Sequence, residues 1–432
     1  MIKAYYFRII SYVLAFFVLQ SSSFPSPLDK AVELAHQEIW KKFVDQYGIV
    51  HGYVGETPTP EDCSIGRPNF IGWRSPISDG AFFTGLYLTA MCEKAQRSGN
   101  KTDREKAKKL ANGLLRCASV SDVPGFIVRG VGTDGQCHYP VGSTDQTVPW
   151  FLGLYRYLKS GIPSETERQL VASKMEKVAD ALNMNDWKLP CDGIFKGQYR
   201  DDLKDKRFLE VPSYLFIIRA MYEITNNDIW NKRYQTALFE HPRGSIEQPS
   251  VSDKTRLEIC AAGYRIDSLI FTGSNIDKNS LWIYVKNQAS LAQLVLLEKD
   301  KTIRTFYQTG LAKNANNAME VIEDYRDFNN NDTKKFGHAN WREGYPIWLP
   351  QKTQADAENL LKKGDTEKLG KRREYEKSFM TNPLAAATII ASSGDHANRE
   401  NIERVICHYD FSKLNLSEFF FAEVAYYSLT VD

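Results

Sequence analysis

Apolar residues recur every three to four positions through most of the chain, the spacing that places them along one face of a helix. Period-two alternation is confined to short segments such as 125–131, so no sheet is expected. The pattern therefore predicts an all-α protein. The helices are predicted at residues 29–47, 80–98, 103–120, 146–160, 164–184, 210–226, 228–240, 255–273, 278–299, 301–323, 383–393, 398–410 and 416–430.

The connections between these helices alternate between short and long. Short turns at 98–101 and 161–163 join helices into pairs, whereas the segments between pairs are rich in Gly, Pro, aromatic and charged residues. This alternation predicts a closed ring of six or seven helical hairpins with the long loops gathered at one end. Helices 80–98 and 383–393, apolar on several faces, are expected inside the ring. Helices 29–47 and 416–430 are expected to close it.

The first residues have the pattern of an export signal. Lys3 and Arg8 precede an apolar run at 9–19 and a small polar segment at 20–23. We therefore expect a signal peptide over 1–23, one mature domain over 24–432, and a secreted or periplasmic protein. No later apolar run is long enough to span a membrane, so no membrane anchor is expected after cleavage.

Composition argues against several function classes. The 55 basic and 53 acidic residues leave a net charge of +2, so nucleic acid is not an expected partner. The seven cysteines contain no Cys-x-x-Cys pair, and neither a metal site nor a cofactor is expected. An odd count leaves at least one thiol unpaired. Cys92 and Cys117 fall on adjacent predicted helices, as buried thiols or as a disulfide.

Two aspartates stand immediately before or within the start of apolar helices. Asp79 lies in the segment WRSPISDGAFF (73–83), and Asp145 lies in GSTDQTVPW (142–150). Two carboxyl groups facing one cavity are the minimum equipment for acid/base cleavage of a glycosidic bond. They have structural alternatives, since Asp79 is a normal N-cap residue and Asp145 would stabilise a helix dipole. The spacing predicts that both reach one end of the ring, as a catalytic pair.

Residues near these aspartates are candidates for binding the substrate. Trp73 and Arg74 flank Asp79, and Gln146 follows Asp145. The glycine-rich loop at 129–139 carries Arg129 and His138, and the arginine fork matches a substrate carboxylate.

Two further segments carry candidate binding residues. Glu210 precedes a predicted inner helix as the two aspartates do, whereas residues 201–207 are predicted to be an ordinary solvated charge run. The segment 336–346 mixes polar and aromatic residues suited to a sugar cleft. Its candidates are His338, Trp341, Arg342 and Tyr345.

The helix start SDGAFFTGLYL (78–88), the export signal and the hairpin spacing resemble the six-hairpin glycosidase superfamily. Members are (α/α)6 toroids and include the unsaturated glucuronyl hydrolases. The resemblance implies an all-α (α/α)6 toroid over most of the mature chain. In the glucuronyl hydrolases, aspartates at the starts of two successive inner helices serve catalysis, and Asp79 and Asp145 are similar to that pair in position.

The expected function is therefore that of an exported glycoside hydrolase acting on an oligosaccharide, one that contains a uronic acid or a similar group. The first alternative is a polysaccharide lyase, because His338, Asn340, Arg342 and Tyr345 are the residue types that abstract a proton beside a uronate. The second alternative is a non-catalytic glycan-binding toroid.

Overall fold

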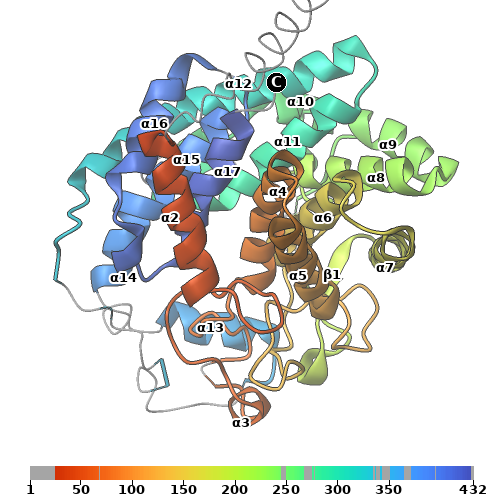
Figure 1. Cartoon of the computed structure of the whole chain (residues 1–432). Coiled ribbons are helices and arrows are strands. Elements are labelled where there is room, and N and C mark those ends of the chain that lie inside the picture. Colours follow the sequence, from red (N-terminus) through yellow and green to blue (C-terminus); the bar gives the residue numbers. More distant parts are fainter. Residues whose placement is uncertain are drawn as a thin grey trace, which may run out of the picture.

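The computed structural model describes residues 25–67, 69–244, 250–266, 275–276, 278–333, 336, 341–342, 351–363, 371–394 and 396–429. The predicted signal peptide lies outside these ranges. The described chain is predominantly helical, as predicted (Figure 1). No helix in the described ranges combines the length and the apolar character needed to cross a membrane.

Six helices form an inner ring, and each contacts the next until the last contacts the first. Each inner helix also packs against an outer helix that adjoins it in the chain or, for the last, at the ring closure. The predicted α/α toroid is thus confirmed as the fold class (Figure 1). The inner helices are α4 (Gly80–Ser98), α6 (Thr144–Lys159), α8 (Val211–Thr225), α11 (Val285–Leu297), α15 (Asn382–Ala391) and α17 (Phe421–Leu429). Their outer partners are, in the same order, α5 (Lys101–Cys117), α7 (Glu165–Met184), α9 (Asp228–Phe239), α12 (Lys301–Ile322), α16 (Arg399–His408) and α2 (Pro27–Lys42).

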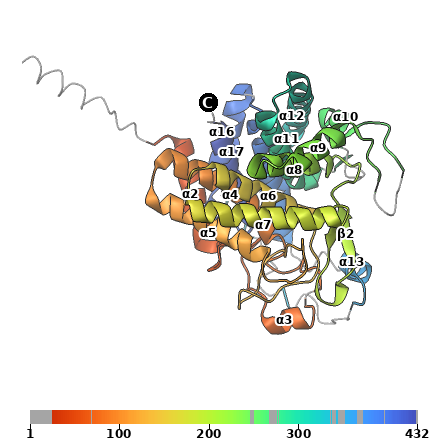
Figure 2. The same ribbon diagram turned by 90° about the vertical axis from the view of Figure 1, so that its right-hand side faces the viewer.

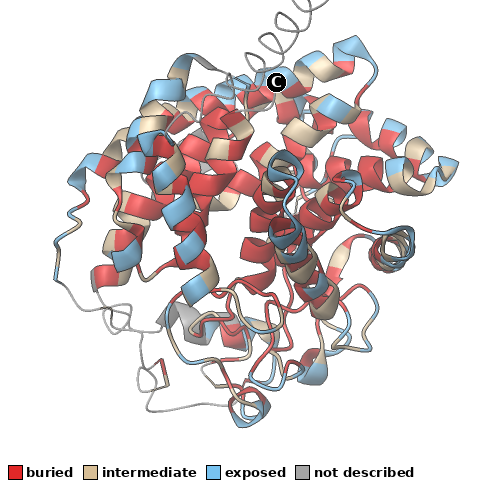
Figure 3. Cartoon of the chain, viewed as in Figure 1, coloured by how far each residue is buried: buried red, intermediate tan, exposed pale blue. Residues whose placement is uncertain are grey.

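Burial separates the two rings. Every residue of α15 is buried, while α5 buries one face and exposes the other (Figure 3). An inner helix is enclosed by its two ring neighbours and its outer partner, so it needs apolar side chains on several faces, whereas an outer helix needs only one apolar stripe. This difference explains why the apolar pattern of 80–98 and 383–393 identified inner helices.

Local capping sets the short turns of the hairpins. Gly99 and Asn226 adopt the left-handed conformation at the ends of α4 and α8, with φ of 62° and 53°. Asn100 and Asn227 then cap α5 and α9, each accepting a hydrogen bond from a backbone amide two residues on. Each chain reversal is therefore completed within a few residues, which keeps both helices of a hairpin side by side.

The long connections all lead from an outer helix into the start of an inner helix. The connections that carry α3 (Pro60–Ser64), α13 (Gln354–Lys363) and an antiparallel pair of strands, β1 (Lys188–Pro190) and β2 (Tyr199–Asp202), lie at the lower edge of Figure 1, and Figure 2 shows them from the side. This is the loop end of the toroid. The N-termini of the inner helices, where Asp79 and Asp145 stand, therefore lie under the loops.

Some predicted elements differ from the structure. The helix expected at 255–273 is wrong in length, because α10 (Arg256–Ala262) stops at Gly263, whose φ of 68° is left-handed. The expectation of no sheet is also wrong, since β3 (Arg265–Ile266) and β4 (Asn275–Ile276) form a short parallel pair in addition to β1 and β2. Helices α3, α13 and α14 (Lys371–Glu376) were not predicted. Helices α3 and α14, with five and six residues, are too short to establish a period.

Helices α4 and α6 cross at two glycines. A Cβ atom added to Gly85 would lie 2.1 Å from the carbonyl oxygen of Pro149, and one added to Gly153 would lie 2.6 Å from that of Gly85. No side chain fits in that space, so the two backbones touch. This contact sets the relative position of the α4 and α6 starts, which lie less than two turns and about two and a half turns away, respectively.

A buried polar network closes the ring between α17, α4 and α2. Glu423 accepts a hydrogen bond from the Tyr87 hydroxyl at 2.9 Å and lies 3.0 Å from Nδ1 of His36. Trp40 donates to the Tyr87 hydroxyl at 3.1 Å. These contacts join the first and last helices of the ring, as the predicted closure by helices 29–47 and 416–430 requires.

Gly85→Ala is expected to destabilise the protein by about 3 kcal/mol, because the added methyl group forces the α4 and α6 backbones apart. Chemical denaturation measures the loss. Gly99→Ala is the matched control, since its Cβ meets nothing within 4 Å and only the φ of 62° resists it, at a cost of about 1 kcal/mol. Equal losses in the two variants would contradict the close crossing.

Candidate active site

Each of the six inner helices brings one ionisable residue to the loop end of the toroid. Four are acids and two are lysines, and we call this set the charged ring. Its members are Asp79 at the start of α4, Asp145 in α6, Glu210 at the start of α8, Lys286 in α11, Lys377 in the π-helical turn before α15, and Glu418 in the turn before α17.

Asp79 occupies the N-cap position of α4, but its side chain makes no capping hydrogen bond. Its Oδ1 instead accepts hydrogen bonds from Arg129 at 3.1 Å and from Gln146 at 3.0 Å. Its Oδ2 has a longer contact, 3.3 Å, with the Ser78 hydroxyl. The side chain is 21% exposed. Asp79 therefore holds the N-cap position that the structural alternative predicted, but without its capping bond, and the carboxylate faces the loop end with one oxygen anchored.

Arg129 joins the starts of α4 and α6. One nitrogen of its guanidinium donates to Asp79 and to the Ser78 carbonyl, and another donates to the Ser143 hydroxyl at 3.3 Å. Burial lowers the pKa of Arg129 to about 10, against the opposing effect of Asp79. The guanidinium therefore stays charged near neutral pH. It is occupied in positioning Asp79, which differs from its predicted role in binding substrate.

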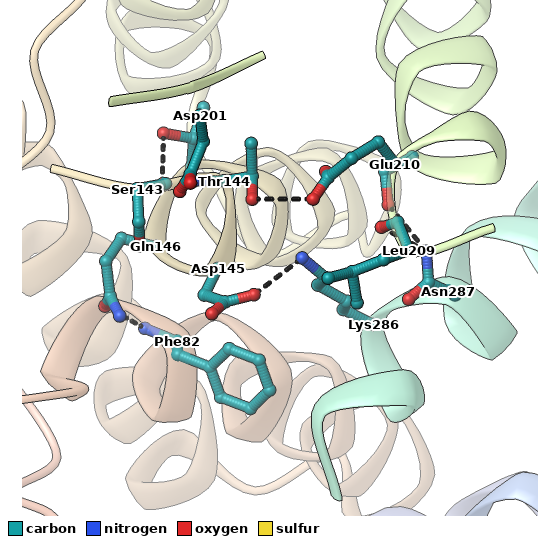
Figure 4. A network of polar contacts seen from close by, with 12 residues as sticks. Phe82, Ser143, Thr144, Asp145, Gln146, Asp201, Leu209, Glu210, Lys286 and Asn287 are labelled. Atoms are coloured by element: carbon teal, nitrogen blue, oxygen red, sulfur yellow. Dashed lines mark hydrogen bonds and ion pairs between the residues drawn. The ribbon is translucent and has the colours of Figure 1, made fainter. Parts of the chain in front are cut away.

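Asp145 forms an ion pair with Lys286, whose Nζ donates to Oδ1 at 2.7 Å (Figure 4). The lysine side chain is fully buried, whereas that of Asp145 is 30% exposed. Burial acts to raise the pKa of Asp145, but Lys286, Arg200 and Arg129 outweigh it and leave the pKa below its ordinary value. Asp145 is thus a carboxylate that reaches solvent with a cation behind it.

Glu210 is buried beside Thr144, the residue before Asp145. Its Oε1 accepts a hydrogen bond from the Thr144 hydroxyl at 3.0 Å, and its Oε2 has no hydrogen-bond partner within the described part of the chain (Figure 4). Burial raises the pKa of Glu210 to about 8, although Lys286 opposes the rise. Since the residue is only 1% exposed, its carboxyl acts on the charged ring rather than on a substrate.

Asn287 fixes the start of α8 against α11. Its Nδ2 donates to the carbonyls of Phe208 and Leu209 and to the Ser213 hydroxyl, at 3.2, 2.8 and 3.2 Å (Figure 4). This contact keeps Glu210 close to Lys286, the neighbour of Asn287 in the chain. The α8, α6 and α11 residues of the charged ring therefore form one network.

A second lysine and acid occupy the α15 and α17 side of the charged ring. The Lys377 ammonium lies 5.0 Å from the centre of the Trp282 ring, which packs edge-on against Phe82 of α4. Burial lowers the pKa of Lys377, and burial raises that of Glu418 to about 7. The partly exposed Trp282 therefore places an aromatic ring beside these charges, supported by the buried Phe82.

Trp73 lies between two arginines. The guanidinium carbons of Arg129 and Arg200 lie 5.3 and 5.2 Å from the centre of its ring. Arg200 also pairs with Asp201 at 3.0 Å, and Asp201 accepts from the Thr144 backbone amide at 3.3 Å. The structure therefore contradicts the prediction of a solvated charge run for Asp201. Arg74, the other predicted neighbour of Asp79, is partly buried, and its carbonyl accepts from Tyr53.

His138 contacts the β1–β2 segment rather than the two aspartates. Its Nε2 lies 2.8 Å from Asp192 Oδ2, and its Nδ1 lies 2.7 Å from the Gln136 carbonyl. Burial would lower the pKa of His138, but these acceptors outweigh burial and raise it. Burial would raise the pKa of Asp192, but the hydrogen bond with His138 and others lower that pKa to about 2. Gln146, by contrast, bonds directly to Asp79, so the structure places one of these two predicted residues at the carboxylates.

The segment 336–346 is described only in part. His338 and Tyr345 lie outside the described residues. Trp341 donates to the Glu56 carbonyl at 2.6 Å, and Arg342 pairs with Asp62 at 2.7 Å. Both predicted sugar-binding residues therefore hold this segment against the 56–62 loop, and the guanidinium of Arg342 is occupied by Asp62 and Glu56.

The opposite end of the toroid has a different character. A cavity of about 320 Å³ lies there, between the C-terminal halves of several inner helices. Most of its lining is aliphatic, and its carboxylate, that of Glu93, is paired with Arg156. Within the described part of the chain, this cavity therefore has none of the charged ring's members in its lining.

Lys286, Lys377 and Glu418 were not identified from the sequence. A signal existed for Lys286, because a lysine in the apolar run LWIYVKNQASLAQL (281–294) is unexpected inside a toroid unless it is paired.

Comparison with known proteins gives little beyond the fold. No protein-family model matches the sequence, and no curated protein matches it. Among solved structures, the chain is similar to a glycoside hydrolase family 76 mannosidase from Bacteroides thetaiotaomicron, at a TM-score of 0.38 and 10% identity, over 68% of this chain and 87% of the other. This likeness assigns neither a residue nor an activity to the chain.

Glu210→Gln is expected to gain stability relative to the wild type as pH rises from 5 to 8. The folded protein keeps a proton on Glu210 up to about pH 8, while the unfolded chain releases it near pH 4.5, so the free energy of unfolding of the wild type falls across this window. Glutamine has no such proton, and the relative gain should reach up to about 4 kcal/mol.

Urea denaturation at several pH values measures this difference. Glu61→Gln, which changes an exposed glutamate, serves as the control and should follow the wild type at every pH. A Glu210→Gln curve parallel to the wild type would show that Glu210 titrates normally in the folded protein.

Proposed function

We propose that the loop end of the toroid is the active site of a glycoside hydrolase, with Asp79 and Asp145 as the reacting carboxyl groups. One observation carries this proposal. Two partly exposed carboxyl groups stand at the starts of neighbouring helices, each in contact with a buried cation, Arg129 or Lys286. Hydrolysis of a glycosidic bond uses such a pair, one group handling the proton of the leaving oxygen and the other acting on water or the sugar centre.

Asp145 is assigned the role of the carboxylate. Lys286 keeps it ionised, so at neutral pH it accepts a proton from water or stabilises the positive charge that develops on the sugar. Lys286 itself is fully buried and cannot reach the substrate. It is a positioning residue that acts through Asp145.

Asp79 is assigned the role of the proton donor. Arg129 and Gln146 both bond to Oδ1, while Oδ2 has only the 3.3 Å contact with Ser78. In the protonated carboxyl, Oδ1 keeps these donors as a carbonyl oxygen and Oδ2 carries the proton toward the leaving oxygen. The anchored geometry thus orients one particular oxygen for proton transfer.

The proposed substrate is an oligosaccharide that contains a uronic acid. Arg200 acts electrostatically on Asp145, so a second carboxylate, that of a sugar, would approach this guanidinium next to the reacting group. The export signal expected over 1–23 supports a substrate outside the cytoplasm. The proposed glycoside hydrolase is therefore a secreted or periplasmic enzyme that acts on acidic glycan fragments.

Replacing the two aspartates is expected to separate their roles. Asp145→Asn should lose about 10³-fold or more in kcat on every substrate, since the reaction at the sugar centre is common to all. Asp79→Asn should lose about 10²- to 10⁴-fold on a natural oligosaccharide but much less on a nitrophenyl glycoside, whose leaving group needs little protonation. Reducing-end release and nitrophenol absorbance measure the two rates.

Asp122→Asn is the matched control, because that carboxylate is 82% exposed and forms a surface ion pair with Lys196. It should keep the wild-type rates. Wild-type activity in both Asp79→Asn and Asp145→Asn would exclude this site. An equal loss on both substrate types in Asp79→Asn would remove its assignment as the proton donor, and a parallel panel with the uronate esterified tests the acidic group.

A further inference from the structure

We infer that Cys63 and Cys137 are the two halves of a disulfide that staples α3 to the glycine-rich loop at 129–139. In the structure all seven cysteines, each of which is described, are free thiols. Cys63 and Cys137 are nevertheless neighbours, since their sulfur atoms lie within hydrogen-bonding reach of each other. They share a small buried cluster with Ile77 and Tyr139.

The backbone around the two thiols is held in place from both sides. The Thr133 amide donates to the Pro58 carbonyl at 2.9 Å, so the two segments run side by side. The Gly132 amide donates to the Cys137 carbonyl at 2.8 Å, and a Cβ on Gly132 would lie 2.2 Å from the Cys137 sulfur. The glycine thus leaves room for that sulfur directly over the loop backbone, next to Cys63.

Cys63 is also fixed within its own helix. The five-residue α3 carries a capping box between Thr59 and Asp62, and the Cys63 amide donates to the Thr59 carbonyl at 3.1 Å. Asp62 is in turn paired with Arg342. The two sulfur atoms are therefore presented by ordered backbones, so forming a bond between them requires little rearrangement.

The reaction is an exchange with an external disulfide such as oxidised glutathione. The partly exposed Cys137 thiolate attacks one sulfur of the oxidant and releases the other as a thiol. The Cys63 thiolate then attacks the Cys137 sulfur and releases the second half of the oxidant. Two protein thiols lose two protons and two electrons, and the oxidant gains them as two thiols. The neighbouring Cys137 and burial both raise the pKa of the Cys63 thiol well above its usual value, so this second step should accelerate as pH rises.

The staple would restrain the residues that position Asp79. The first residue of the 129–139 loop is Arg129, which bonds to Asp79. Its last residue is Tyr139, whose hydroxyl donates to the carbonyl of Arg67. A bond at Cys137 fixes this loop to α3. None of this depends on the catalytic assignment, since the disulfide forms from the packing of the two loops alone.

Peptide mapping of the full chain tests the inference. The folded protein is incubated with oxidised glutathione at pH 8, its remaining thiols are blocked with N-ethylmaleimide, and it is digested without reductant. A peptide that joins Cys63 to Cys137, with the other five cysteines blocked, is the expected result. Recovery of both residues as blocked thiols, or of either joined to another cysteine, would overturn it.

Thermal unfolding supplies a second readout. In the oxidised protein, Cys63→Ser and Cys137→Ser should each lower Tm by roughly 5 °C, and the double variant by no more than either. Dithiothreitol should lower the wild-type Tm toward theirs and leave the variants unchanged. Cys407→Ser, at an exposed cysteine, is the control and should keep the wild-type Tm. A wild-type Tm that is insensitive to dithiothreitol after oxidation would contradict the staple.

Discussion

The direct backbone contact between α4 and α6 at Gly85 and Gly153 is the constraint on which the proposed site depends. Helices that meet through side chains lie about 8–10 Å apart, and the glycines allow a closer approach. Both helices enter the crossing from the loop end, so their first turns lie next to each other. Arg129 and Gln146 then bridge those turns by bonding to the same oxygen of Asp79. Backbone packing thus brings the carboxyl groups together before any substrate is present.

The electrostatics of the loop end follow from the same geometry. Six inner helices point their N-termini at one region, and the positive ends of their dipoles favour acids there. Four acids in a confined space would repel one another, and the buried cations Lys286, Lys377 and Arg129 compensate them. The result is an uneven distribution of protons, in which Asp145 is ionised while Glu210 and Glu418 hold protons up to about pH 8 and about pH 7. An environment that separates the proton affinities of like groups is a frequent property of catalytic sites.

The fold and part of the site could be predicted because they depend on local signals. Helix period and turn length identified the hairpins, and α4 begins and ends where the pattern placed it, at residues 80–98. Asp79, Asp145 and Glu210 could be picked out as candidates because they stand at the starts of apolar helices. Lys286 could not, since its role depends on a contact with Asp145, 141 residues away in the chain. The contacts of Trp341 and Arg342 with the 56–62 loop could not be predicted for the same reason, because composition cannot tell a sugar cleft from a loop held by ion pairs.

The central claim is that water cleaves a glycosidic bond at the loop end, and the most direct test is to run the reaction in water enriched in ¹⁸O. Uronate-containing oligosaccharides are incubated with the protein and the products are weighed by mass spectrometry. The account predicts products that carry one ¹⁸O at the new reducing end, and none when Asp145→Asn replaces the wild type. Cleavage that adds no ¹⁸O and leaves one fragment lighter by one water molecule than the hydrolysis product would identify a lyase and contradict the account. Tight binding without any product would identify a glycan-binding toroid and contradict it as well.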